Sequence, residues 1–167
     1  IYSMGKLCQA IELGTVDYAD ACILQSSLAC ERAAGNRSDC ILLLQHPHTY
    51  TLGRTAKYEH LLYTEDQLTD YGIVVCETDR GGGITYHGPG QLVGYPIMDL
   101  GSLHMDGLHT LTSDYISYIR KLEIMIISIL RIYGIDSVQL PGLTGVWVES
   151  PSFSRPQGTL CNGDELS

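Results

Sequence analysis

Basic residues are scarce in this chain of 167 residues. Only ten Lys and Arg stand against nineteen Asp and Glu, which gives a net charge of -9 with the histidines neutral. Binding to a phosphate backbone needs clustered basic side chains, whereas those of this chain are scattered along the sequence. The composition therefore argues against a nucleic-acid partner.

Long apolar runs are also missing. The longest one, near residues 124–132, is too short to span a bilayer and lies close to Lys121 and Arg131. The first residues contain no basic stretch followed by an apolar one, so no signal peptide is predicted. We expect a protein without a membrane partner, located in the cytoplasm, or in an organelle (mitochondrion or plastid) if a targeting segment has been removed.

The six cysteines form no C-x-x-C pair, and their spacing is irregular. Five of them lie in apolar stretches typical of strands or helices. The pattern predicts small buried hydrophobic side chains in a reducing compartment. The cysteines are Cys8, Cys22, Cys30, Cys40, Cys76 and Cys161.

Apolar periodicity predicts a strand through Leu7, Ile11 and Leu13, and then a helix that begins after Asp17 and ends before Gly35. Thr64 and Gln67 form a capping-box pattern for a short helix. Further strands are expected over residues 40–45, 73–78, 91–100 and 144–150. Gly94 and Pro96 place the third of these at a sheet edge or a bulge.

A long helix is predicted near residues 113–133, where Glu123 interrupts the apolar stripe and shifts the expected buried face towards Leu122. Strands and helices follow one another without regular βαβ alternation. This order favours an α+β fold, with a mixed β-sheet and helices packed on it. Residues 1–149 are expected to form one domain, and the Ser-, Pro- and Gly-rich residues 150–167 a loop or disordered tail.

The sequence "DRGGGITYHGPGQLVGYPIMDL" covers residues 79–100 and concentrates glycines around a few polar side chains. A run of glycines lets a ligand or another backbone approach closely, but it also suits a simple hairpin turn. Thr85 and His87 are expected on one strand face, with Ile84 and Tyr86 on the other, buried one. The spacing matches neither phosphate-binding glycine motif of nucleotide enzymes.

The segment R-G-G-x-x-T-Y-H-x-x-G-Q, followed by Tyr95, resembles the signature of the octanoyltransferases, which are lipoyl(octanoyl) transferases of lipoate biosynthesis. Three further segments are similar to that family: residues 13–25, residues 42–54 with the His46-Pro47 pair, and "TGVWV" at 144–148. The resemblance covers the chain up to about Glu149.

The resemblance implies the fold of the biotin- and lipoate-protein ligase catalytic domains, which is related to class II aminoacyl-tRNA synthetases. It implies transfer of an octanoyl group from octanoyl-acyl carrier protein to a lysine of a lipoyl domain, as in 2-oxoacid dehydrogenases and the glycine cleavage H protein. No cofactor is implied. The residues that match the family's acyl pocket are Arg80, Gly81, Gly82, Gly83, Ile84, Thr85, Tyr86 and His87, with His46, Gly88, Gly90 and Gln91 as weaker candidates.

The family's nucleophilic Cys and its activating Lys have no match up to Ser167, the last residue of the sequence, so both are expected beyond Ser167 and the chain resembles a truncated protein. Cys161 lies in a polar, Gly-flanked stretch without a nearby Lys or His, and it is not expected to replace the nucleophile. No catalytic residue is therefore predicted within the chain. Acyl binding without transfer is the expected property of these residues alone.

His46 and His48 leave two interpretations open. Each could face a pocket beside His87 or cap the backbone of the preceding strand, and capping is favoured for both; two histidines alone do not predict a metal site.

Two other functions also stay open. One is an adenylating ligase of the lipoate or biotin type, and the other is an acyl-binding protein without catalysis.

Overall fold

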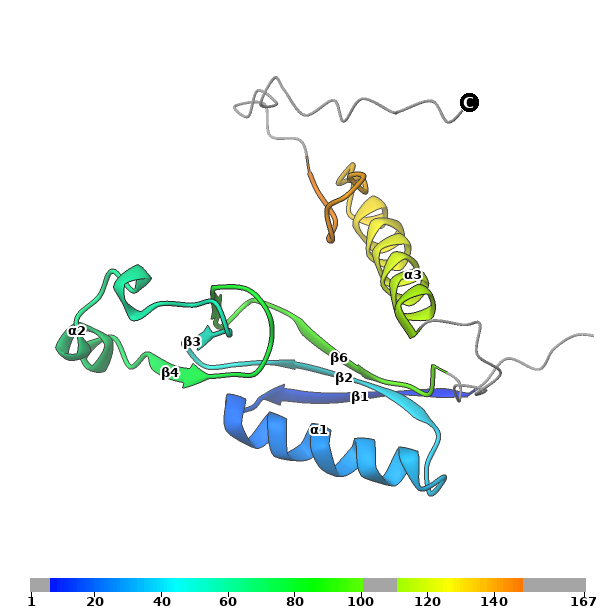
Figure 1. Cartoon of the computed structure of the whole chain (residues 1–167), viewed down its shortest axis with the longest axis horizontal. Helices are drawn as coiled ribbons and strands as arrows, with labels where there is room; N and C mark the ends of the chain where they lie inside the picture. The colour runs from blue at the N-terminus through cyan, green and yellow to red at the C-terminus, as the bar shows by residue number, and fades with distance from the viewer. Residues whose placement is uncertain (1–6, 101–110, 149–167) are drawn as a thin grey trace, which may run out of the picture. The chain divides into compact units, whose positions relative to one another are not determined.

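The computed structural model describes residues 7–100 and 111–148 (Figure 1). The chain divides into two compact units, residues 1–99 and residues 100–167, and each is considered by itself. The first unit holds the strands of both sheets, and the second holds the long helix. The expected single domain over residues 1–149 stays a prediction, and the expected tail from residue 150 to Ser167 lies outside the described part.

Strand β2 (Asp39–Gln45) is the centre of the first sheet. It pairs in parallel with β1 (Cys8–Thr15) and antiparallel with β6 (Val93–Ile97). Strand β6 forms one edge of this sheet, which suits Pro96 because proline has no N–H to give to a further strand. The predicted edge position is confirmed.

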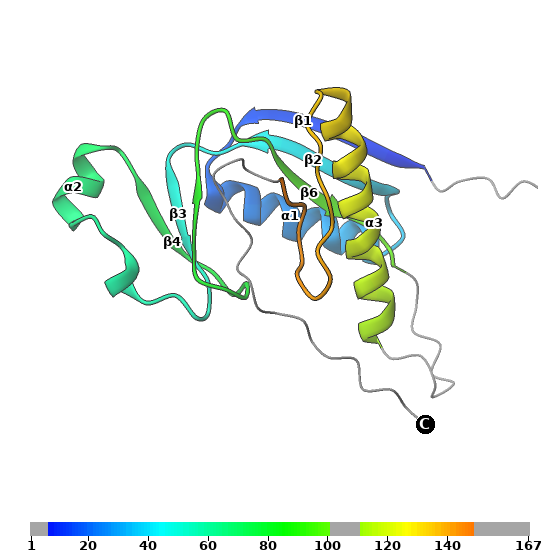
Figure 2. The ribbon, with the colours of Figure 1, turned by 90° about the horizontal axis from the view of Figure 1, so that it is seen from above.

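Helix α1 (Tyr18–Ala33) runs along this sheet in both views (Figures 1 and 2). Alternate residues of a strand share one face, and the core cluster joins alternate residues of β2 to α1. Burying each leucine contributes about 1.5–3 kcal/mol. One face of β2 is buried, whereas Ile41 and Leu43 on the other face are half-buried. The core cluster consists of Ala21, Leu28, Cys40, Leu42 and Leu44.

An arginine ties the end of α1 to the sheet. The Arg32 guanidinium donates to the carboxylates of Asp39, at the start of β2, and Asp99, which follows β6. The Asp99 backbone N–H also donates to the Asp39 carboxylate. This network joins the end of α1 and the start of β2 to the distant residue Asp99 at one end of the sheet.

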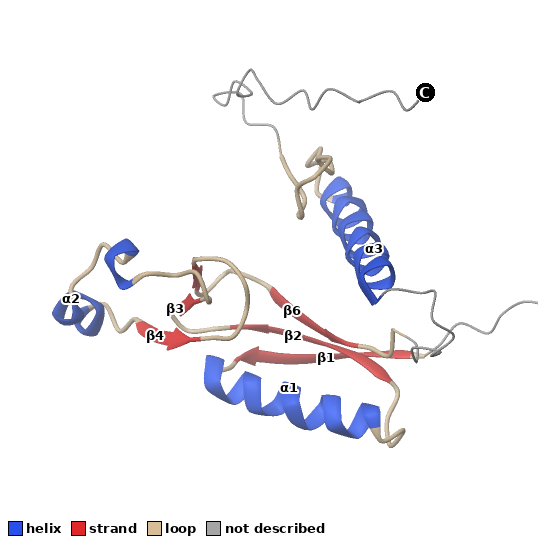
Figure 3. Ribbon diagram, in the orientation of Figure 1, coloured by secondary structure: helices blue, strands red, loops and turns tan. Residues whose placement is uncertain are grey.

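Strand β3 (Thr49–Leu52) is the centre of the second sheet, with β4 (Val74–Glu77) parallel and β5 (Ile84–His87) antiparallel to it (Figure 3). Sequence reasoning misses β3, because the segment has only four residues and follows directly on the loop at Pro47. The chain between β3 and β4 forms a 3-10 turn (Tyr58–His60) and helix α2 (Glu65–Asp70). The capping box of Thr64 and Gln67 is confirmed.

The glycine-rich connection from β4 to β5 is not a hairpin turn. Strands β4 and β5 lie on opposite edges of β3, so the connection must cross the end of β3 between them. The hairpin interpretation is therefore wrong. Both sheets mix parallel and antiparallel pairs and carry helices, which confirms the α+β class, although the strands form two sheets of three rather than one.

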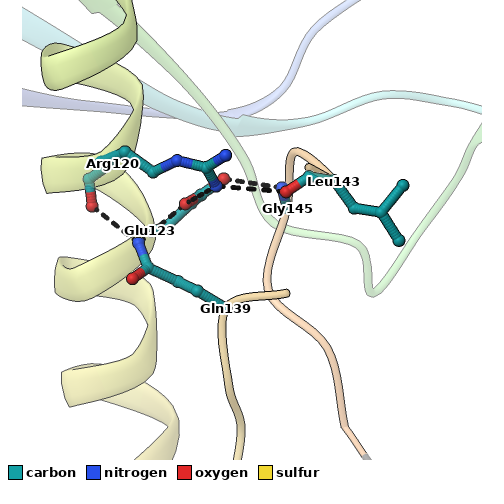
Figure 4. A network of polar contacts seen from close by, with 5 residues as sticks. All are labelled: Arg120, Glu123, Gln139, Leu143 and Gly145. Atoms are coloured by element: carbon teal, nitrogen blue, oxygen red, sulfur yellow. Dashed lines mark hydrogen bonds and ion pairs between the residues drawn. The ribbon is translucent and has the colours of Figure 1, made fainter. Parts of the chain in front are cut away.

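The second unit holds helix α3 (Leu111–Ile132), close to its predicted bounds. The expected shift of its buried face towards Leu122 is wrong, because Glu123 itself is only 3% exposed. Its carboxylate accepts hydrogen bonds from Arg120, Gln139 and the Gly145 backbone N–H, which remove the cost of burial (Figure 4). The last predicted strand is reduced to one bridge between Val138 and Trp147.

The burial predicted for the cysteines is wrong for several of them. Cys40 is buried, but Cys8 and Cys30 are exposed and Cys22 and Cys76 are half-buried, and all five carry free thiols. Cys161 lies outside the described residues. Across residues 7–100 and 111–148, no helix is long and apolar enough to cross a membrane.

Candidate functional site

Aromatic rings from four elements meet in the first unit. The His46 ring, directly after β2, lies 5.3 Å from Tyr18 of α1, 5.6 Å from His87 of β5 and 6.0 Å from Tyr95 of β6, between ring centroids. Tyr18 and His87 stack at 6.2 Å. We call these four residues the ring cluster. It joins both sheets and α1 at one place.

The topology explains why Tyr18 and His46 meet. Strands β1 and β2 are parallel, with Thr15 opposite Gln45, so both chains leave the sheet at the same edge. The carboxyl ends of parallel strands are where ligand sites of such sheets usually form. Val16 N–H donates to the Gln45 carbonyl at 2.9 Å and holds the two exits together.

The hydrogen bonds of His46 define its tautomer. The ring is fully buried, and its Nδ1 lies 2.7 Å from the Val16 carbonyl, which can only accept, so Nδ1 carries the proton. In the neutral ring Nε2 then accepts from the Tyr95 hydroxyl at 2.9 Å. The favoured capping of the preceding strand is wrong for His46, because its backbone partner is Val16, which follows β1, and the ring lies beside His87 as in the other interpretation.

Burial raises the pKa of Tyr95 to about 12, with smaller contributions from Tyr18 and Cys22. Since the unfolded phenol titrates near 10, the folded state holds its proton more tightly, and stability is lost as pH rises from about 10 towards 12. A tyrosine signal that titrates near 12 by ¹³C-tyrosine NMR is expected, and it should vanish in Tyr95→Phe.

The same substitution leaves the buried Nε2 of His46 without its donor, so we expect Tyr95→Phe to lower the free energy of unfolding by about 1–3 kcal/mol. Urea denaturation measures this change. Tyr115→Phe, at an exposed tyrosine of α3, is the matched control and should leave stability unchanged. An unchanged midpoint for Tyr95→Phe would mean that the hydroxyl contact contributes nothing.

His87 is oriented by the loop that follows it. Its Nδ1 lies 2.7 Å from the Gln91 side-chain oxygen and therefore donates, which leaves Nε2 of the neutral ring as an acceptor. Gly90 N–H donates to the Gln45 side chain at 2.7 Å, which fixes this loop to the end of β2. The loop therefore connects His87, Gly90 and Gln91 to the ring cluster. Gly88 instead leaves room for the Tyr86 ring.

Arg80 organises the glycine segment. Its guanidinium donates to the Thr51 carbonyl at 2.7 Å, to the Thr51 hydroxyl at 2.8 Å, and to the carbonyls of Gly81 and Gly83 at 3.0 Å each. Gly82 adopts a φ of 84°, a left-handed conformation that favours glycine. The triple glycine is therefore a tight loop wrapped around one arginine.

Lysine cannot reproduce the planar fork of Arg80. We expect Arg80→Lys to lower the free energy of unfolding by about 2 kcal/mol, because Thr51 is fully buried and its carbonyl loses a charged donor. Arg54→Lys provides the control, since Arg54 is exposed. Equal unfolding curves for the two variants in a thermal or denaturant melt would show that the fork does not hold the loop.

The structure divides the predicted site residues into two groups. Tyr86 does not share the side of His87: its hydroxyl lies 2.6 Å from His48 Nδ1, and its ring lies against Tyr50. A side chain at Gly88 would collide with Tyr86, so the glycine is required for this placement. The expected buried face of β5 is wrong, since Tyr86 is exposed and Ile84 only half-buried. Thr85 pairs with Thr51 across the sheet.

Sequence reasoning misses two residues of this arrangement, Tyr18 and Thr51. For His48 it leaves a pocket and a capping role open, and the favoured capping role is wrong because the partner of His48 is the Tyr86 hydroxyl. The parallel order of β1 and β2 is the signal that identifies Tyr18, which follows the end of β1 as His46 follows the end of β2. Among residues 7–100 and 111–148 there is no cluster of three potential metal ligands.

The expected position of the catalytic pair stays a prediction. The nucleophilic Cys and its Lys are expected beyond Ser167, and the structure describes the chain only as far as residue 148. Ser167 and the residues that lead to it therefore lie outside the described part. The site that the structure does describe consists of groups that can hold a substrate.

The sequence matches the family described as Lipoyl protein ligase A/B catalytic domain over residues 17–155. The chain belongs to this family. The class expected from the signature is thereby confirmed.

Curated relatives carry a narrower description. The octanoyltransferase of Solibacter usitatus is 48% identical over 141 residues, which cover 84% of this chain and 60% of that protein. The octanoyltransferase of Mycobacterium avium is 44% identical over 149 residues, or 89% of this chain and 56% of the relative. The chain thus spans about 60% of the length of the curated relatives it matches.

A solved structure supports the fold. The bipartite lipoate protein ligase of Thermoplasma acidophilum, from an archaeal lipoylation system, superposes with a TM-score of 0.57 at 21% identity. The match covers 86% of this chain and 52% of that one. The predicted fold of the lipoate-protein ligase catalytic domains is confirmed.

Proposed function

We propose that the chain is the substrate-holding part of an octanoyltransferase. This enzyme would move an octanoyl group from octanoyl-acyl carrier protein to a lysine of lipoyl domains, such as those of 2-oxoacid dehydrogenases and the glycine cleavage H protein. The observation that carries the proposal is the ring cluster, where His87 of the signature segment is oriented by Gln91 beside buried His46. The curated octanoyltransferases that share 44–48% of their aligned residues with this chain support it.

The chemistry of the ring cluster suits an acyl thioester. Aromatic side chains provide apolar surface for the alkyl chain, and burial contributes roughly 0.8 kcal/mol per CH₂, or about 5–6 kcal/mol for an octanoyl tail. Nε2 of neutral His87 accepts a hydrogen bond and carries no charge that would repel an apolar chain. Binding of this kind needs no adenylate, so no cofactor is part of the proposal.

The transfer itself needs a nucleophile. A thiolate attacks the thioester carbonyl, the bond to the carrier's sulfur breaks, and the carrier leaves as a thiol. The lysine amine of the acceptor then attacks the new thioester, forms the amide, and releases the enzyme's cysteine. We propose that this cysteine and the lysine that lowers its pKa belong to segments beyond Ser167, for which the present sequence has no match.

Incubation with octanoyl-acyl carrier protein tests the proposal. The 167-residue chain is expected to gain no octanoyl mass, whereas a version extended through the downstream Lys and Cys is expected to gain one octanoyl group and to pass it to an apo-lipoyl domain. Intact-mass spectrometry measures both steps. A stable octanoyl adduct on Cys161 would contradict the assignment of the nucleophile.

Two outcomes would favour the other functions. ATP-dependent release of pyrophosphate by the extended protein would indicate an adenylating ligase. Such a ligase needs a cation that binds the phosphate of the adenylate. Arg80 does not favour this function, because its guanidinium donates to carbonyls of its own loop. Octanoate binding without transfer in the extended protein would indicate an acyl-binding protein that has lost catalysis.

A further inference from the structure

A second group of rings lies apart from the ring cluster. It surrounds a cavity of about 350 Å³ in the first unit, which we call the tyrosine pocket. The residues that line it are His48, Tyr50, Tyr63, Tyr71, Ile73 and Tyr86. None of them belongs to the ring cluster, and the proposed acyl transfer does not use them.

The rings of the tyrosine pocket meet at steep angles. Tyr63 and Tyr71 lie 5.7 Å apart with their planes at 74°, and Tyr50 and Tyr86 lie 5.5 Å apart at 58°. Tyr86 is held in place by the His48 ring, which stacks with it and bonds its hydroxyl. Four of the six side chains that line this space are tyrosines, and a tyrosine ring attracts an ammonium or guanidinium group placed over its face.

The chain segment that supplies Tyr63, Tyr71 and Ile73 of the pocket lining carries a net negative charge, the complementary sign for a cation. Between Lys57 and Asp79 the chain carries six Asp and Glu and a single lysine, and that Lys57 is already paired with Glu59 at 3.3 Å. No Lys or Arg lines the pocket. Tyr63, Tyr71 and Tyr86 are 42%, 60% and 41% exposed, so a side chain from another molecule can reach their faces.

We propose that the tyrosine pocket binds a basic side chain, Lys or Arg, of a partner protein. The aromatic rings attract the cation, and the net negative charge of residues 57–79 favours its approach. An apolar side chain of the same length would receive no such attraction. The proposal stands on these contacts and does not depend on the acyl chemistry.

Two matched peptides test it. A short acetylated peptide with two lysines separated by glycine, and the same peptide with norleucine in place of lysine, are titrated into the full chain labelled with ¹³C-tyrosine. The lysine peptide is expected to shift the ring signals of Tyr63, Tyr71 and Tyr86, and the shifts should weaken as salt is added. The norleucine peptide is expected to leave them in place.

Substitutions locate the binding. Tyr63→Leu and Tyr71→Leu should each weaken binding of the lysine peptide about two- to fivefold, the size of one exposed cation–π contact. Tyr58→Leu is the matched control, because Tyr58 is an exposed neighbouring tyrosine outside the pocket lining. Equal shifts with the norleucine peptide, or no shift with either, would overturn the proposal. A failure of the extended protein to transfer octanoyl groups would not contradict the proposal about the tyrosine pocket.

Discussion

Glu123→Ala is expected to release the loop over residues 139–145 from helix α3. The Glu123 carboxylate accepts from Gly145 N–H at 2.7 Å, from the Arg120 guanidinium at 2.7 Å and from the Gln139 side-chain nitrogen at 2.8 Å. Figure 4 shows these groups converging on one side chain. Alanine removes the acceptor of all three. Amide exchange at Gly145 should become about ten- to a hundredfold faster, the loss expected for a hydrogen bond to a charged group.

The same carboxylate predicts a dependence on pH. The hydrogen bond from Gly145, followed by that of Arg120, lowers the pKa of Glu123 below its ordinary value of 4.5. A lowered carboxylate pKa contributes stability that is fully present above about 4.5 and is lost as pH falls through the folded-state value. The protection of the Gly145 amide from exchange should therefore decline in acid in the unmodified chain. In Glu123→Ala the protection should show no such decline.

Lys121→Ala serves as the control for this experiment. Lys121 is an exposed residue of α3, two positions from Glu123 and outside the network. Its replacement changes charge and side-chain length on the same helix turn without removing an acceptor. Equal exchange rates at Gly145 in the two variants would show that the carboxylate does not hold the loop.

Gly53→Ala is expected to push the glycine segment away from the end of β3. A Cβ at Gly53 would collide with the carbonyl oxygen of Gly82 and lie 2.9 Å from that of Gly81. Both obstacles are backbone atoms, and Gly53 N–H also donates to the Gly83 carbonyl at 3.0 Å. The substitution should lower the free energy of unfolding by roughly 1–3 kcal/mol, as overpacking does elsewhere.

The displacement should also separate Arg80 from its carbonyl partners and weaken octanoate binding. Gly94→Ala is the matched control, because a Cβ there would meet only the side-chain ends of Ile41 and Leu43 at 3.6 and 3.7 Å, an ordinary contact. Denaturant melts and calorimetric titration with octanoate measure the two effects. If Gly53→Ala had the same unfolding midpoint and the same affinity for octanoate as Gly94→Ala, the close packing of the loop against Gly53 would be contradicted.

Local signals in the sequence predict much of the fold. The capping box of Thr64 and Gln67 is a short-range pattern in which neighbours in sequence are also partners in space. Asp17 and Gly35 mark the two ends of α1 correctly, although the Asp17 side chain makes no capping hydrogen bond. Apolar runs mark β2 and β4 for the same reason. The order of the strands is not accessible in this way, since β3 is short and its polar Thr49 and Thr51 are buried by long-range pairing.

The candidate site shows the same limit. The signature segment identifies His87 and Gln91, whose side chains form a hydrogen bond. It also includes Tyr86, whose side chain lies on the other side of β5 and contacts His48 instead. Arg80 is expected from the sequence to flank a ligand, but its guanidinium satisfies loop carbonyls that only the three-dimensional fold brings near it. Glu123 is expected to turn outward because a lone carboxylate is costly to bury, whereas partners 16 and 22 residues away complete its hydrogen bonds.

The most direct test of the account is histidine NMR with octanoyl-pantetheine, a small thioester that carries the same acyl group as the proposed donor. The chain is labelled with ¹⁵N-histidine and titrated with the thioester. The account predicts shifts at His46 and His87 of the ring cluster, with His48 of the tyrosine pocket and His60 of the 3-10 turn unchanged. Shifts confined to His48, or no shift at any of these histidines, would contradict the claim that the signature segment and the end of β2 together hold the acyl group.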